Sequence, residues 1–184
     1  MLASSWPMGS AHFEFPSTFQ ALYQKSYKLY QEGQRGADTF FTAEETAWLA
    51  ANGITAQHVY DYAEDDVVDG APGFGNALTI ETVRRDYFLS VQAGGASTTV
   101  LDPATLPAKS DEIEGIRWLA RIIPKAKAKL RGEMPASMMY CCGGDRRFFR
   151  TNHIMPAEFL SLIRRHIDDD AAVIAWVKAR IHQN

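Results

Sequence analysis

The chain of 184 residues carries 19 Lys and Arg residues against 22 Asp and Glu residues, so its formal net charge is −3. This length is sufficient for one domain, or two small ones, with a buried core. No run of about 18 apolar residues occurs, which argues against a membrane-spanning helix. The N-terminal segment lacks the basic and apolar regions of a signal peptide, so we expect a cytoplasmic protein.

The N-terminal part is predicted to be helical after a short lead. Residues 1–15 are expected to be poorly ordered, and the first helix is predicted to begin at Ser17 or Thr18, directly after Pro16. Large apolar and aromatic side chains then recur at helical spacing and predict a stripe that faces the core. They are Phe19, Leu22, Tyr23, Tyr27 and Tyr30.

Capping residues mark the next helix starts. Thr42 and Glu45 match the capping box, in which the hydroxyl and the carboxylate bind free backbone donors at the start of a helix. Another helix is predicted to start at Thr55. Residues 71–75, rich in Gly and Pro, are predicted to form a loop before a helix capped by Asn76.

A basic amphipathic helix is predicted at Ile113–Arg131. Its apolar residues recur every three or four positions and form one stripe. They are Ile113, Ile116, Leu119, Ile123, Ala126 and Leu130. Arg117, Arg121 and Lys125 stand four apart and form a basic ridge beside this stripe. Because Pro124 removes a backbone donor inside the helix, we expect a kink or a break near it.

The remaining segments also read as helices. Asp145, after the sharp turn allowed by two glycines, is predicted to cap a helical turn, and Pro156 is predicted to open another helix. The acidic residues 168–170 mark the start of the last one. About six to eight helices with long loops, and no clear alternating strands, predict an all-α multi-helix bundle.

One segment has the composition of a linker. Residues 93–109 are rich in Gly, Ser, Thr and Pro. This linker would separate an N-terminal helical part, residues 16–92, from a C-terminal helical part, residues 110–184. One compact domain formed by both parts is the alternative.

The charges are distributed unevenly along the chain. From Asp38 to Asp69 there are eight acidic residues and no Lys or Arg, whereas Arg117 to Arg150 contains nine basic and two acidic residues. Either the two regions face each other, or the basic region faces an anionic partner. The basic residues therefore form a solvated face, dock on the acidic half, or bind phosphate or carboxylate groups.

The second half resembles a known family. The residues that carry the resemblance are 115–132, Tyr140, residues 145–149 (Asp-Arg-Arg-Phe-Phe) and residues 169–177. They resemble the bacterial family called domain of unknown function 5069, over about residues 101–180. Members of that family usually have their proline earlier in the central helix and an acidic residue at the position of Pro124. The resemblance implies a fold group and no catalytic residues.

The leading functional hypothesis is a non-catalytic binding or interaction protein. It would recognise a small anionic ligand or an acidic protein surface through the basic region. The candidate ligand-binding residues are Arg117, Arg121, Tyr140, Cys142, Asp145, Arg146 and Arg147. The Asp145–Arg146 pair either presents an arginine fork to an anion or fixes the turn against the core. Nucleic acid is not the expected partner, because the chain is acidic overall and has no recognised docking motif. The sequence does not set the oligomeric state.

An enzymatic alternative uses a thiol. Cys141 or Cys142 lies in an electropositive stretch that lowers thiol pKa values, and Asp145, Arg146 and His153 would complete the site. The competing interpretation is that both cysteines are small buried residues.

A second alternative is a metal-dependent helical-bundle enzyme. His58, Asp61 and Asp65 fall on roughly one face of a helix, where they are candidate ligands for a divalent metal. Acidic residues at such positions also occur as a solvated surface, and our prediction is that the protein holds no metal or cofactor.

Overall fold

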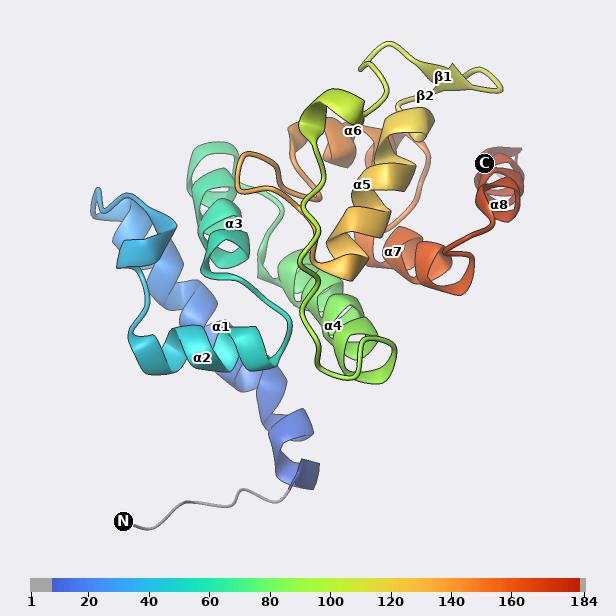
Figure 1. Cartoon of the computed structure of the whole chain (residues 1–184). Helices are drawn as coiled ribbons and strands as arrows, with labels where there is room; N and C mark the ends of the chain where they lie inside the picture. Colours follow the sequence, from blue (N-terminus) through green and yellow to red (C-terminus); the bar gives the residue numbers. More distant parts are fainter. Residues whose placement is uncertain (1–7, 183–184) are drawn as a thin grey trace.

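The computed structural model describes residues 8–182, and in this part of the chain it contains eight α-helices and one two-stranded sheet (Figure 1). The all-α multi-helix fold predicted from the sequence is therefore confirmed. The helices are α1 (Met8–Gln31), α2 (Ala43–Ala51), α3 (Ala56–Asp69), α4 (Phe74–Ser90), α5 (Leu119–Arg131), α6 (Gly143–Thr151), α7 (Pro156–Arg165) and α8 (Asp170–His182). The strands are β1 (Glu112–Ile113) and β2 (Ile116–Arg117). None of these helices is both long enough and apolar enough to cross a membrane.

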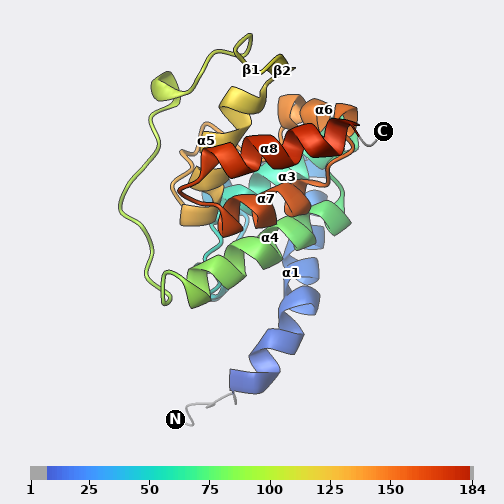
Figure 2. The same ribbon diagram turned by 90° about the vertical axis from the view of Figure 1, so that its right-hand side faces the viewer.

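The helices form two groups joined through α4. In Figure 1, α1, α2 and α3 lie on one side of the molecule and α5 to α8 lie on the other. Helix α1 packs against α3 and α4, and α4 also packs against α5 and α7. The turned view in Figure 2 shows α4, α7 and α8 as successive layers on one side.

Two hydrophobic cores meet at α4. Its residue Ala77 belongs to the N-terminal core around Phe19, while Ile80 and Tyr87 belong to the larger C-terminal core around Phe159. Because α4 precedes the predicted linker and still contributes to the C-terminal core, the two helical parts share buried surface.

The start of α1 corrects a prediction made from the sequence. Residues 8–15 were expected to be poorly ordered, but they form the first turns of α1, which continues past Pro16. Phe15 anchors these turns, since only 3% of its surface is exposed and its ring stacks on that of Trp48 at 5.7 Å. Pro16 lies on the exposed side, where the carbonyl that loses its partner can bind water. Residues 1–7 of the predicted lead lie outside the described part.

The predicted helix at Ile113–Arg131 is also corrected. Its first residues form the hairpin β1–β2, because Glu114 and Gly115 have φ angles of 51° and 78°, as a two-residue type I′ turn requires. Helix α5 begins only at Leu119. The helix continues across Pro124 to Arg131, so the predicted break does not occur.

Several predicted helix boundaries are confirmed and others shift. Thr42 and Thr55 each form a capping box, and α7 begins at Pro156. Helix α4 begins at Phe74, upstream of the cap predicted at Asn76. The turn predicted at Asp145 is a longer helix, α6, of which Asp145 is the third residue.

The segment between α4 and β1 contains no α-helix, as expected for residues 93–109, and runs along the outside of the molecule in Figure 2. It is nevertheless tied to the C-terminal part. The backbone N–H of Leu101 donates to the carbonyl of Glu133 at 2.8 Å, and Arg121 Nη1 donates to the carbonyl of Pro107 at 2.6 Å. These contacts hold Lys109 close to α5 and α6.

Candidate functional site

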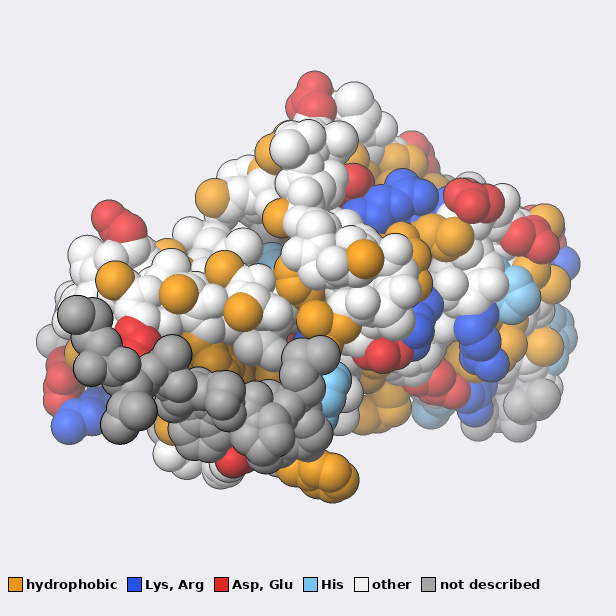
Figure 3. Space-filling model, turned by 60° about the horizontal axis from the view of Figure 1, so that its bottom comes forward, with side chains coloured by type: hydrophobic (Ala, Val, Ile, Leu, Met, Phe, Trp, Pro, Cys, Tyr) orange, Lys and Arg blue, Asp and Glu red, His pale blue; other side chains and the backbone are white. Residues whose placement is uncertain are grey.

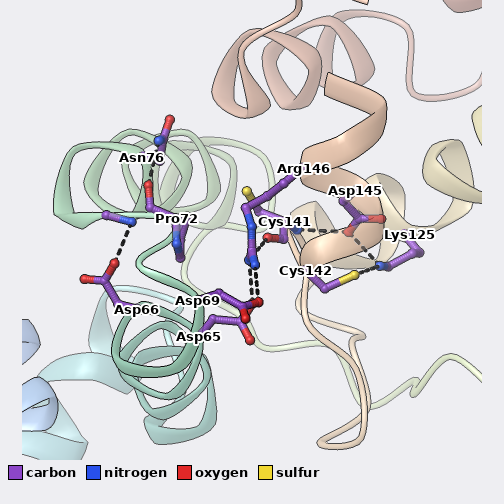
Figure 4. A network of polar contacts seen from close by, with 11 residues as sticks. Asp65, Asp66, Asp69, Pro72, Asn76, Lys125, Cys141, Cys142, Asp145 and Arg146 are labelled. Atoms are coloured by element: carbon purple, nitrogen blue, oxygen red, sulfur yellow. Dashed lines mark hydrogen bonds and ion pairs between the residues drawn. The ribbon is translucent and has the colours of Figure 1, made fainter. Parts of the chain in front are cut away.

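Asp145, near the start of α6, organises the polar contacts around the predicted site. Its side chain is fully buried and accepts three hydrogen bonds. Oδ1 accepts from Trp118 Nε1 at 2.9 Å, while Oδ2 accepts from Lys125 Nζ at 2.6 Å and from the backbone N–H of Cys141 at 3.0 Å. Figure 4 shows Asp145 between Lys125 and Cys141. Because both oxygens are occupied, Asp145 holds its neighbours in place and has no free oxygen for a ligand.

Two residues that contact Asp145 have unusual backbone conformations. Trp118 and Cys141 have φ angles of 74° and 73°, which are rare for residues other than glycine. Such conformations persist only where surrounding contacts hold them, and they cluster at functional sites. The indole of Trp118 also lies so close to Gly144 that a Cβ atom there would come within 2.4 Å of the ring. The absence of a side chain at Gly144 therefore allows the indole to approach α6 closely.

Arg146 joins the two halves of the chain. Its Nη1 lies 2.5 Å from Asp65 Oδ2 and its Nη2 lies 2.9 Å from Asp69 Oδ2, both on α3 (Figure 4). Nη1 also donates to the carbonyl of Cys141 at 2.9 Å. Only 6% of Arg146 is exposed. Its guanidinium is therefore already paired with carboxylates of the protein. For Arg146, the basic region thus contacts the acidic region, which was one of the three alternatives that the sequence left open.

A second buried ion pair lies further along α5. Lys129 Nζ is 2.5 Å from Glu81 Oε1, and Tyr62 OH donates to the same oxygen at 2.8 Å. Burial alone would raise the pKa of Glu81, but the charge of Lys129 and these hydrogen bonds hold it below its ordinary value. The pair connects α4 to α5 in the middle of the molecule.

A cavity of about 390 Å³, here called the basic cavity, lies beside the hairpin and α6. The residues that line it are Lys109, Arg117, Trp118, Gly144, Arg147, Phe148, Thr151 and Asn152. Lys109, Arg117 and Arg147 are exposed, and none of their side chains makes a hydrogen bond or an ion pair with any residue between 8 and 182. The cavity thus combines three unpaired cations with the apolar surfaces of Trp118 and Phe148.

A second cavity of about 490 Å³, here called the mixed cavity, is also lined by Trp118. It shares Lys109, Trp118 and Gly144 with the basic cavity, so the two are adjacent. Charged residues of both signs line it: Asp61, Glu64 and Asp65 from α3, and Lys109, Arg121 and Lys125. Met138, Met139 and Cys142 supply apolar surface.

The predicted ligand-binding residues divide into three groups. Arg117 and Arg147 line the basic cavity, and Arg121 and Cys142 line the mixed cavity. Tyr140, Asp145 and Arg146 are buried and serve the packing; Tyr140 OH, for example, donates to the carbonyl of Pro156 at 2.8 Å. Lys125 was noted from the sequence only as a member of the basic ridge, and Lys109 and Gly144 were not among the candidate residues. The positions of Lys109 and Gly144 in the cavities depend on contacts with distant residues, which no local pattern marks.

The thiol site proposed from the sequence is assembled only in part, since Cys141, Arg146 and His153 line one cavity but Cys142 lines another. Burial raises the pKa of Cys141 to about 12, so its thiol is protonated near neutral pH. Cys142 Sγ lies 3.4 Å from Lys125 Nζ in the mixed cavity. His153 is exposed and lines a different cavity of about 440 Å³, next to Cys141 and Arg146. The structure therefore does not bring Cys142 and His153 to one cavity.

The candidate metal ligands have other partners. His58 Nδ1 lies 3.2 Å from Lys129 Nζ, and burial together with that charge lowers the pKa of His58 to about 3. Asp61 Oδ1 accepts from Gln57 Nε2 at 2.6 Å, and Asp65 binds Arg146. Between residues 8 and 182, no group of three or more His, Cys, Asp or Glu side chains is arranged to hold a metal ion.

Several half-buried cations elsewhere on the surface form ion pairs. Arg164 forms an ion pair with Asp86, and Lys127 Nζ lies 2.7 Å from Asp170 Oδ1. On the face seen in Figure 3, Lys and Arg side chains are interspersed with Asp and Glu side chains, as such pairing produces. Within residues 8–182, the exposed residues Arg35, Arg150 and Arg165 form no ion pair either, so the basic cavity is distinguished by the gathering of three such cations around one concave surface.

Comparison with protein families places part of the chain. Residues 105–184 match the family described as domain of unknown function (DUF5069), which confirms the resemblance noted from the sequence. Comparison with curated proteins and with solved structures gave no match. The residues that line the basic cavity all fall inside the matched part, whereas α3, which carries the acidic wall of the mixed cavity, falls outside it.

Proposed function

We propose that the protein binds a small organic anion in the basic cavity and does so without catalysing a reaction. The observation that carries this proposal is the gathering of Lys109, Arg117 and Arg147 around one cavity without any partner in residues 8–182. Unpaired cations of one sign attract and hold an anion. A concave site of about 390 Å³ suits a small molecule better than a flat acidic protein surface.

The apolar lining indicates the rest of the ligand. Trp118 and Phe148 offer aromatic surface, and the hydrogen bond from Trp118 Nε1 to Asp145 fixes the indole. A surface that is already rigid loses little conformational entropy when a flat molecule packs on it. The arginine forks suit the oxygens of phosphate, carboxylate or sulfonate groups. The ligand class is therefore an aromatic ring that carries such a group.

The same lining supports binding rather than catalysis. General acid–base and nucleophilic catalysis use a carboxylate, an imidazole, a thiol, an activated hydroxyl or a lysine amine within reach of the bound molecule. The basic cavity is lined by no Asp, Glu, His or Cys residue of the described chain, and its hydroxyl, on Thr151, has no basic residue bonded to it. Apart from the amine of Lys109, the groups that line the cavity are suited to holding an anion rather than to activating a nucleophile.

Calorimetric titration with 4-ethylphenyl phosphate tests this proposal. Arg117→Ala and Arg147→Ala are each expected to weaken binding by about tenfold, or ~1.4 kcal/mol, because each removes a charge-assisted hydrogen bond. Arg165→Ala is the matched control. Arg165 is an exposed arginine at the end of α7 that has no partner in the described residues and does not line the cavity.

Two results would show the proposal to be wrong. One is an equal loss of affinity in Arg165→Ala, which would indicate unspecific attraction by net charge. The other is equally tight binding of the neutral analogue 4-ethylphenol, which would indicate an apolar site in which the cations have no part. Rising salt concentration should also weaken the binding of the phosphate, because the cations are exposed.

A further inference from the structure

Three carboxylates are buried in the described residues, and one of them lacks a cation. Glu81 is paired with Lys129, and Asp145 is paired with Lys125. Asp61 is only 9% exposed, yet it forms no ion pair within residues 8–182. Its Oδ1 accepts from Gln57 Nε2 at 2.6 Å, and its Oδ2 has no partner there. A buried carboxylate without a counter-ion is costly, and the other two show how this fold ordinarily meets that requirement.

Asp61 borders open space. It lines the mixed cavity together with Glu64 and Asp65, the residues three and four positions further along α3. Asp65 is neutralised by Arg146, while Glu64 accepts only a hydrogen bond from Tyr30. The α3 wall of this cavity therefore carries two carboxylates, on Asp61 and Glu64, that form no ion pair with a basic group of the described chain.

The mixed cavity continues from the basic cavity. Trp118, Lys109 and Gly144 line both, so a molecule that packs on the indole in one cavity can extend into the other. Along this path the unpaired charges change sign, from Arg117 and Arg147 at one end to Asp61 and Glu64 at the other. Figure 1 shows the corresponding elements, with α3 on one side and α5, α6 and the hairpin on the other.

We infer that the ligand carries a protonated amine as well as an anionic group, and that Asp61 and Glu64 bind the amine in the mixed cavity. This inference rests on the proposed function, because the anionic end is assigned to Arg117 and Arg147. The ligand is then a zwitterionic aromatic molecule that spans Trp118. Its amine supplies the counter-ion that Asp61 lacks, and Met138 and Met139 contact the apolar segment between the two ends.

The electrostatics of Asp61 are consistent with this arrangement. Burial raises the pKa of Asp61 to about 7. The hydrogen bond from Gln57 and the charge of Lys129 lower this pKa, whereas the charges of Glu64 and Asp65 raise it. Across the cavity, Arg121 and Lys125 also face the α3 wall, but Arg121 donates to the carbonyl of Pro107 and Lys125 is held by Asp145. A ligand cation beside Asp61 favours its ionised form.

A pair of probes that differ only in the amine tests the inference. The probes are 4-(2-aminoethyl)phenyl phosphate and 4-ethylphenyl phosphate, titrated calorimetrically at about pH 8, where the carboxyl group of Asp61 is ionised. The amine-bearing probe is expected to bind wild-type protein about tenfold more tightly, as one charge-assisted contact allows. Asp61→Asn and Glu64→Gln should remove this advantage and leave the affinity for 4-ethylphenyl phosphate unchanged. Glu44→Gln, at an exposed glutamate in the first turn of α2, is the matched control.

The outcomes separate the two proposals. If both phosphates bind with equal affinity, the amine subsite is wrong and the anion site stands. If 4-ethylphenyl phosphate does not bind but tyramine, the amine without the phosphate, binds in a manner that depends on Asp61, the anion site is wrong and the amine subsite stands. If none of the three probes binds, both proposals are overturned.

Discussion

The basic residues of the C-terminal part fall into two regions that the structure uses differently. Lys125, Lys129 and Arg146 are buried, and each lies against a carboxylate of the protein. Lys109, Arg117 and Arg147 are exposed around a cavity and have no partner in the described residues. The first region holds helices together, and we expect the second to hold a ligand. Basic character alone therefore does not reveal which cations are available to a partner.

The difference has a physical cause. Moving a charge out of water is unfavourable, and a buried cation is stabilised by an anion at contact distance, as for Lys125, Lys129 and Arg146. Arg84, also buried, instead donates to the side-chain oxygen of Gln92. An exposed cation keeps its hydration and needs no partner, so it remains free to exchange water for a ligand. The uneven distribution of charge along the sequence thus has two consequences. The acidic half supplies partners for Arg146, and the basic part keeps other cations free.

The sharpest test of the first region, the buried cations Lys125, Lys129 and Arg146, is to break the Lys129–Glu81 pair. Lys129→Met leaves Glu81 buried without its cation and is expected to lower the free energy of unfolding by about 3–5 kcal/mol. The double variant Lys129→Met, Glu81→Leu should recover most of this loss, because no unpaired charge remains. Urea denaturation measures both.

Lys127→Met provides the control for that experiment. Lys127 lies on the same helix, and its pair with Asp170 is half-exposed, so the loss should stay within about 1 kcal/mol. If Lys127→Met and Lys129→Met destabilise the protein equally, the two regions do not differ in the way described.

Asp61→Asn should show a smaller effect that depends on pH. The folded protein raises the pKa of Asp61 to about 7, so it binds this proton more tightly than the unfolded chain does. The contribution of Asp61 to stability is therefore fully present below the pKa of the unfolded chain and is lost as the pH rises through about 7. Relative to wild type, Asp61→Asn should become more stable above that pH, by on the order of 3 kcal/mol.

Thermal unfolding of both proteins over a series of pH values measures this difference. Below the pKa of the unfolded chain, where Asp61 is protonated in both the folded and the unfolded state, the two should be similar in stability, and the difference should grow as the pH rises from there to about 7. A constant difference at all pH values would contradict the pKa assignment and would point to the lost hydrogen-bond geometry with Gln57 instead.

The adjacent arginines on α6 provide the most direct comparison of the two regions. Arg146→Ala removes contacts with Asp65, Asp69 and the carbonyl of Cys141 and should lower the free energy of unfolding by about 1–3 kcal/mol. Arg147→Ala removes an exposed side chain without partners in the described residues and should change it by less than about 0.5 kcal/mol. Chemical denaturation measures the free energy of unfolding of both variants. If Arg147→Ala also lowers the free energy of unfolding by several kcal/mol, Arg147 belongs with the buried, paired cations and the comparison is wrong.

The hairpin shows why one part of the fold could not be read from periodicity. Ile113 and Ile116 stand three residues apart, which fits the apolar stripe of a helix. In the hairpin they are direct cross-strand partners and thus also lie side by side. The pattern is therefore the same for both structures. What distinguishes the hairpin from a helix is the turn at Glu114 and Gly115, where both φ angles are positive.

Local chemistry determined much of the helical architecture. Thr42, Thr55 and Pro156 mark helix starts because their effects depend only on backbone groups a few residues away. The apolar stripe of α1 was likewise readable, and Phe19, Leu22, Tyr23 and Tyr30 are all buried. The sequence also placed Arg117 and Arg147 among the candidate binding residues.

Only the tertiary structure decided which charged residues meet. Arg146 and Arg147 are neighbours of the same type, yet one contacts Asp65, 81 residues away in the sequence, while the other has no partner in the described part. Asp61 is distinguished from the acidic residues around it by the burial of its side chain and the absence of a cation beside it there. Charge pairing depends on distances of a few ångströms between helices that are far apart in the chain, and no local pattern of residues encodes those distances.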